Sequence, residues 1–119
     1  MKRVITPLLP LLLAGCVDLG QVGMHPTMQQ GYFNASVERT YRCLETSALE
    51  QQLFIEEDEP FSNGDKRYNL TRGGEVVGWM DISLFNKAQS MVNVYYNPKD
   101  KSLEHNIEEM MHTCKQSEL

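Results

Sequence analysis

Hydrophobic positions recur with a helical period in two segments, residues 36–50 and 101–115. In the first segment the apolar side chains recur every third or fourth position: Val37, Tyr41, Leu44 and Ala48. In the second they follow the same spacing: Leu103, Ile107, Met110 and Cys114. This spacing places each set on one face of a helix. Ser36 suits the N-cap of the first helix, since its hydroxyl can accept a backbone hydrogen bond there. The pattern therefore predicts two amphipathic helices.

Between these helices the hydrophobic period changes to two, which is typical of strands. The alternation covers residues 52–57, 66–71, 76–84 and 90–96. Gly73 and Gly74 suit a two-residue hairpin, because glycine tolerates the positive φ that such turns require. The sequence thus predicts an α+β domain. It would have an antiparallel meander of three or four strands, with the N-terminal and C-terminal helices on one face.

The N-terminal segment follows neither period. Lys2 and Arg3 precede an apolar run over residues 4–13, and Leu13-Ala14-Gly15-Cys16 follows. A membrane-spanning helix needs about 20 apolar residues, so this run is too short to be one. The segment resembles the signal peptide and lipobox of bacterial lipoprotein precursors. That resemblance implies cleavage before Cys16 and attachment of lipid to Cys16.

The resemblance also implies an organisation and an address. Residues 1–15 would be the signal peptide, residues 16–33 the lipidated cysteine with a flexible tether, and residues 34–119 a single α+β domain. In this family an aspartate directly after the lipidated cysteine favours the inner membrane, and here Val17 stands in that place. The expected address is therefore the outer membrane, anchored through lipid on Cys16 and facing the periplasm.

With Cys16 assigned to lipid, Cys43 and Cys114 remain as a pair. An even pair in an oxidising compartment predicts a disulfide, which would join the two helices. A thiol nucleophile or a metal site is disfavoured, because a convincing histidine partner and a CxxC spacing are both missing from the sequence.

Loss of Lys2 and Arg3 with the signal peptide would change the formal charge from −5 to −7. An acidic protein repels phosphate backbones, so nucleic acid is not an expected partner.

Two polar clusters are candidates for chemistry. The first lies on the predicted C-terminal helix and consists of His105, Glu108, Glu109 and His112. Its side of the helix is opposite Leu103, so a solvated polar face is a better interpretation than a metal site. The second is the acidic run Glu56, Glu57, Asp58 and Glu59. It is better interpreted as an exposed edge or a docking point for a basic partner than as a catalytic pair. Nucleophile motifs and phosphate loops are missing, so we expect no catalysis, cofactor or metal.

The remaining candidate is a partner surface on the strands. Alternation places Val77, Trp79, Met91 and Tyr95 opposite Met80 and Ile82. If the helices cover the Met80 side, the first group forms an open binding face. The alternative is that this group lies in the core, and the high average burial of tryptophan favours that alternative by a small margin.

These features predict a lipid-anchored, non-catalytic envelope lipoprotein that acts through contact with an envelope protein. The alternative function is an inhibitor or immunity-type protein that binds a periplasmic enzyme, such as a basic cell-wall hydrolase. The small disulfide-linked fold and the acidic charge motivate that alternative.

Overall fold

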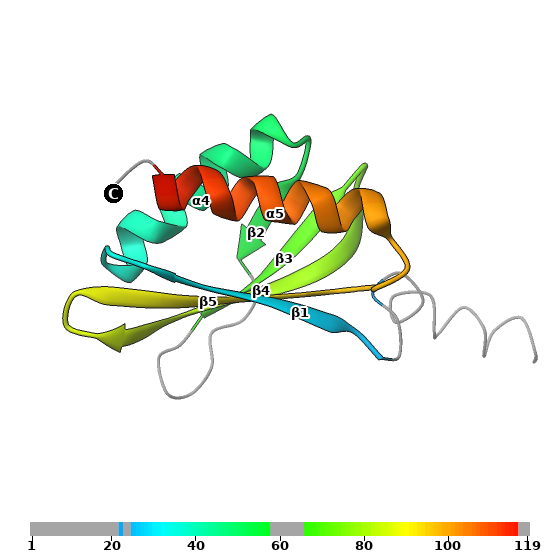
Figure 1. The fold of residues 1–119 in the computed structure, drawn as a ribbon. Helices are drawn as coiled ribbons and strands as arrows, with labels where there is room; N and C mark the ends of the chain where they lie inside the picture. The colour runs from blue at the N-terminus through cyan, green and yellow to red at the C-terminus, as the bar shows by residue number, and fades with distance from the viewer. Residues whose placement is uncertain (1–21, 23–24, 58–65, 117–119) are drawn as a thin grey trace, which may run out of the picture.

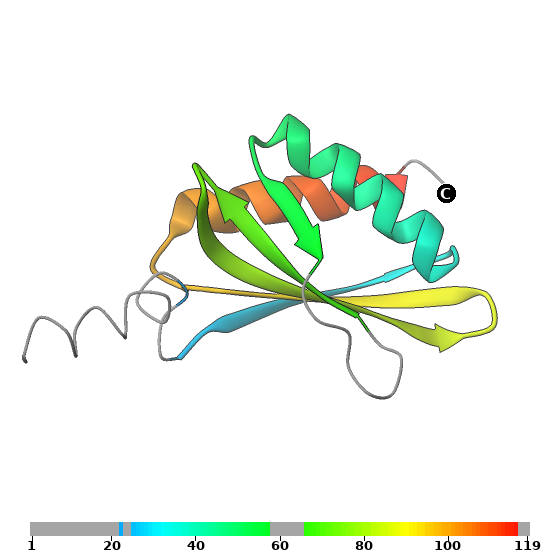
Figure 2. The same cartoon turned by 180° about the vertical axis from the view of Figure 1, so that it is seen from behind.

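The computed structural model describes residues 22, 25–57 and 66–116. In this part of the chain, five antiparallel strands form one sheet in the order β1-β5-β4-β3-β2. The strands are β1 (Thr27–Phe33), β2 (Phe54–Glu57), β3 (Lys66–Arg72), β4 (Glu75–Asn86) and β5 (Gln89–Tyr96). Helices α4 (Val37–Glu50) and α5 (Lys101–Gln116) lie side by side on one face of the sheet (Figures 1 and 2). The predicted α+β class is confirmed, but the predicted number of strands is wrong, since the sheet has five.

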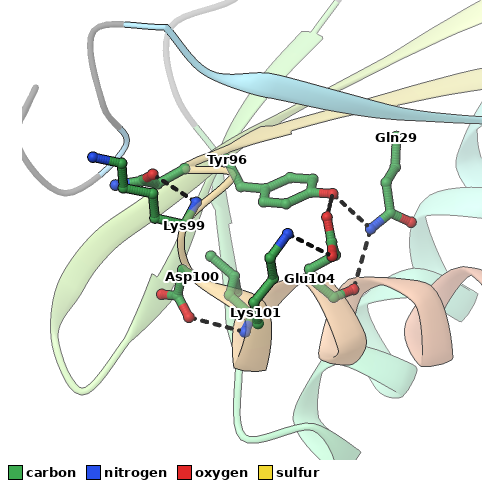
Figure 3. Close-up of polar contacts among 8 residues, drawn as sticks. Gln29, Tyr96, Lys99, Asp100, Lys101 and Glu104 are labelled. Carbon is green, nitrogen blue, oxygen red and sulfur yellow. Dashed lines mark hydrogen bonds and ion pairs between the residues drawn. The ribbon is translucent and has the colours of Figure 1, made fainter.

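The strand that the sequence interpretation missed is β1, which occupies residues assigned there to the tether. All seven of its residues pair with β5, from Thr27 opposite Tyr96 to Phe33 opposite Ser90. Gln29 also ties β1 to α5, because its Nε2 donates to Tyr96 Oη at 3.2 Å and to the backbone oxygen of Glu104 at 3.1 Å (Figure 3). The tether expected over residues 16–33 is therefore wrong for residues 27–33. Cys16 itself lies outside the described residues.

Both helices begin at the capping residues that their sequences supply. Ser36 Oγ accepts a hydrogen bond from Arg39 N at 3.2 Å at the start of α4. Asp100 Oδ1 accepts one from Leu103 N at 3.1 Å at the start of α5. Asp100 also forms an ion pair of 2.7 Å with Arg72, so the β3–β4 hairpin is joined to the start of α5.

The core lies between the helices and one face of the sheet. The predicted apolar stripes of both helices face it, and the sheet contributes alternate residues of every strand. Fully buried members of the core include Leu44, Leu70, Met80, Ile82, Val92, Val94, Leu103, Ile107 and Met110. Gly73 and Gly74 have φ of 62° and 84°, which confirms the hairpin predicted between β3 and β4.

The two helices are linked covalently at the C-terminal end of α5. Cys43 and Cys114 form a disulfide, with their Cα atoms 5.8 Å apart, as the sequence predicts. A second helix-to-helix contact is buried beside it, since Ser47 Oγ donates to the backbone oxygen of Met110 at 3.1 Å. The helix pair is thus a fixed layer over the sheet.

A β-bulge changes the orientation of Val77. Leu70 pairs with Gly78 while Thr71 pairs with Val76, so Val77 is the extra residue of β4 at this point. An extra residue interrupts the alternation of faces. Val77 is consequently buried in the core, and its predicted place on the partner surface is wrong.

Candidate functional site: the open face of the sheet

No described element covers the face of the sheet opposite the helices (Figures 1 and 2). We call this surface the open face. Strand register arranges its side chains in three cross-strand rows. They are Glu56, Asn69, Trp79, Tyr95 and Met28; then Arg67, Asp81, Asn93 and Gln30; then Ser83, Met91 and Tyr32.

The centre of the open face is an arginine held between an acid and two aromatic rings. Arg67 Nε and Nη2 meet the two carboxylate oxygens of Asp81 at 2.7 and 2.9 Å. The guanidinium carbon lies 5.7 Å from the centre of the Trp79 ring and 5.9 Å from the Tyr95 ring. Bidentate pairing and ring contact fix the planar guanidinium in one place. The guanidinium at the centre of the open face is therefore held in a defined position.

One margin of the open face is apolar and more exposed. Tyr32 and Phe85 pack with ring centres 4.7 Å apart, and they are 44% and 53% exposed. Met28 is 44% exposed at the other end of β1, and Met91 is half-buried opposite Tyr32. Between these side chains, Gln30 Nε2 donates to Asn93 Oδ1 at 2.9 Å. This margin therefore offers apolar contact area, and the amides of Gln30 and Asn93 within it are already hydrogen-bonded to each other.

The structure brings together three of the predicted surface residues, Trp79, Met91 and Tyr95. The alternative that they lie in the core is wrong, because the helices cover the Met80 side of the sheet. The sequence interpretation did not include Arg67, Met28 and Tyr32. Arg67 was detectable, since it alternates with the buried Tyr68 and Leu70.

The acidic run does not form one surface in the described residues. Glu56 and Glu57 are exposed on β2, and Asp58 and Glu59 lie outside the described residues. Glu56 pairs with Asn69 in the first row of the open face. Glu57, one position on, is on the opposite side of its strand because successive strand side chains alternate.

The polar cluster of α5 is on the solvent side, as predicted. His105, Glu108, Glu109 and His112 are all exposed, and His105 Nε2 lies 3.9 Å from Glu109. Across the described residues, no group of three or more His, Cys, Asp or Glu side chains is arranged to hold a metal ion.

A second aromatic pair lies on the helix side of the sheet. Tyr41 of α4 stacks on Tyr68 of β3, with ring centres 4.6 Å apart and planes tilted by 21°. Burial, and then the hydrogen bond to Glu45, raise the pKa of Tyr41 to about 12. The phenols therefore stay protonated at neutral pH, and this pair stabilises packing between α4 and the sheet.

Comparison with protein-family models, with curated proteins and with solved structures finds no match to this chain. None of the helices that the structure describes has the length and apolar character needed to cross a bilayer.

Proposed function

We propose that this chain is a lipid-anchored, non-catalytic envelope lipoprotein that binds a protein partner through the open face. The observation that carries the proposal is a sheet face that no described element covers, with Trp79, Tyr95 and Arg67 at its centre. Trp, Tyr and Arg are the residue types most enriched at the energetic centres of protein interfaces.

The physical state of these side chains also supports protein contact. A preorganised interface loses less side-chain entropy on binding, and Arg67 is already fixed by Asp81. The apolar margin formed by Met28, Tyr32 and Phe85 supplies area that a partner can remove from water.

The proposed location in the cell envelope rests on the sequence. Lys2, Arg3, the apolar run and Leu13-Ala14-Gly15-Cys16 support export and lipidation at Cys16. The Cys43–Cys114 disulfide is compatible with this address, since disulfides persist in oxidising compartments such as the periplasm.

The test is affinity capture from cross-linked native envelopes with the full-length protein. Four forms are compared: wild type, Cys16→Ala, the double variant Trp79→Ala/Tyr95→Ala, and Leu49→Ala. Leu49 is a matched control, because it is apolar and 52% exposed but belongs to α4 in the helix layer. We expect wild type and Leu49→Ala to capture one stoichiometric partner, and we expect the double variant to lose it.

Two results would change the proposal. Capture that survives Trp79→Ala/Tyr95→Ala would show that the open face is not the interface. A captured enzyme whose activity falls on binding would identify the chain as an inhibitor or immunity-type protein. The Cys16→Ala form then tests placement, because loss of capture with this form alone indicates that the lipid brings the partners together.

A further inference from the structure

The two edges of the sheet differ in length and charge. Edge strand β2 has four residues, two of them the exposed Glu56 and Glu57. Edge strand β1 has seven residues, TMQQGYF, with no charged side chain and no proline. Among the described residues, no strand pairs with the outer side of β1. Natural sheets protect their edges with short strands, charges, proline or bulges, and β1 has none of these.

We propose that β1 pairs with β1 of a second copy of this chain, antiparallel and centred on Gln30. The two five-stranded sheets would then form one continuous sheet. The proposal goes beyond the function given above, since it concerns the backbone edge of β1, although Met28, Gln30 and Tyr32 of this strand also lie on the open face.

On the open face, β1 is its own complement in this register. Gln30 lies opposite Gln30 of the second copy. One N–H of its amide is donated to Asn93, and the second N–H and Oε1 can exchange hydrogen bonds with the facing amide. Met28 lies opposite Tyr32 of the second copy, and methionine sulfur makes favourable contacts with aromatic rings. Met28 and Tyr32 are each 44% exposed, so this pairing buries apolar area now in contact with water.

On the helix side, the same register places a large residue opposite a small one. Gln29 faces Gly31 of the second copy, and Phe33 faces Thr27. A Cβ atom at Gly31 would lie 2.9 Å from Met111 Cε and 3.3 Å from Lys115 Cε, so α5 approaches β1 closely here. Each large side chain on this side therefore faces a smaller residue of the second copy.

Charge complementarity between the α5 helices supports this register. Lys115 lies beside Gly31, and Glu104 contacts Gln29 through its backbone oxygen. Because Gly31 faces Gln29 of the second copy, each Lys115 would lie across the seam from Glu104 of the other copy. Each Lys115 is thereby set toward Glu104 of the other copy, whose carboxylate also accepts from Tyr96 Oη and pairs with Lys101.

Disulfide trapping in the full-length, lipidated protein tests the pairing. Gln30→Cys places two thiols at the centre of symmetry, where Cβ atoms directly opposite each other lie about 4.5–5.5 Å apart. Asn93→Cys is the matched control, because Asn93 is the neighbour of Gln30 in the same row but belongs to the inner strand β5. Mild oxidation is expected to give a covalent dimer with Gln30→Cys and none with Asn93→Cys.

Dimers from both variants would indicate association through the open face and would overturn the edge proposal. Absence of a dimer from both variants would overturn it as well.

A second test uses charge, so that the result does not depend on whether the cysteine substitution disturbs the fold. Gln30→Lys and Gln30→Glu should each weaken self-association by about fivefold, because like charges then face each other. An equimolar mixture of the two should restore it, and a mixture no tighter than either variant alone would overturn the proposal. Disulfide trapping of Gln30→Cys is repeated in the Trp79→Ala/Tyr95→Ala background, which alters the centre of the open face and leaves β1 unchanged. A covalent dimer in this background shows edge pairing even if the open face binds no partner, so the two proposals can fail separately.

Discussion

Arg67 and Asp81 face each other across β3 and β4, and the guanidinium meets both carboxylate oxygens of Asp81 at 2.7 and 2.9 Å. Both side chains are largely shielded, with 32% and 21% exposed. Single-contact ion pairs at the surface lose most of their energy to solvent and to side-chain entropy. This pair is bidentate and is supported by two rings, so it is expected to contribute more.

The first prediction concerns the energy of that pair. A double-mutant cycle with Arg67→Met and Asp81→Asn is expected to give a coupling of about 1 kcal/mol in the free energy of unfolding by urea. The control is the exposed Arg42–Glu38 pair on α4, for which about 0.3–0.5 kcal/mol is typical. Equal coupling for the two pairs would show that the rings and the bidentate geometry add nothing.

The second prediction concerns the Cys43–Cys114 disulfide, whose residues are separated by 71 positions. Closing a loop of this length stabilises the fold by about 4 kcal/mol in the chain-entropy model. Replacing both cysteines by alanine should therefore lower the urea midpoint strongly. Dithiothreitol should lower the midpoint of the wild type and leave that of the double variant unchanged. A wild-type midpoint insensitive to reductant, with loss of the disulfide verified by thiol titration, would contradict the prediction.

The helices and their link were predictable because their signals are local. Leu103, Ile107 and Cys114 follow a helical spacing over several turns, and all three are buried as that spacing predicts. Tertiary packing buries the same side of each helix that the local hydrophobic spacing indicates, so the two agree. The disulfide followed from the pairing of the remaining cysteines and from the apolar sides of the two helices.

Strand β1 was not predictable in the same way. Gly31 is a poor strand former, and Gln29 and Gln30 are not among the β-branched and aromatic residues that favour strands. The segment is held by seven pairs with β5 and by contacts with α5. These partners lie at least 57 positions away in the sequence, the separation of Phe33 and Ser90, so no local pattern reports them.

The open face was predictable as a set of residues but not as an exposed surface. Alternation separates Trp79 from Met80, yet both sides of the strands carry apolar residues. Which side is buried depends on where α4 and α5 dock. Val77 was misplaced for a different reason, because a single bulge reverses the alternation and a bulge has no sequence signal here.

The third prediction is a loss of stability at high pH that involves Tyr41. Its pKa is raised to about 12 in the folded protein, chiefly by burial, against a usual value of 10.0. Between these two pH values the unfolded phenol loses its proton while the folded one keeps it. Stability from this group is therefore complete below pH 10 and falls as pH rises toward about 12.

Urea unfolding between pH 9 and about 11.5 measures this effect. Tyr41→Phe should have a shallower decline than wild type, because phenylalanine cannot ionise. Tyr32→Phe is the control, since Tyr32 is 44% exposed on the open face. Identical slopes for wild type and Tyr41→Phe would contradict the raised pKa, and the absorbance of tyrosinate gives an independent titration.

The last prediction concerns Thr40, a fully buried residue of α4 whose Oγ1 has no hydrogen-bond partner among the described residues. A buried hydroxyl without a partner costs about 1–3 kcal/mol, because it has lost its hydrogen bonds to water. Valine has nearly the same shape and the same branching at Cβ, so Thr40→Val should raise the free energy of unfolding by about 1 kcal/mol. Thr46→Val is the matched control, since Thr46 lies in the same helix but is exposed and should show no such gain. A destabilised Thr40→Val, measured by urea unfolding beside that control, would mean that the hydroxyl is hydrogen-bonded in solution, for example to a buried water.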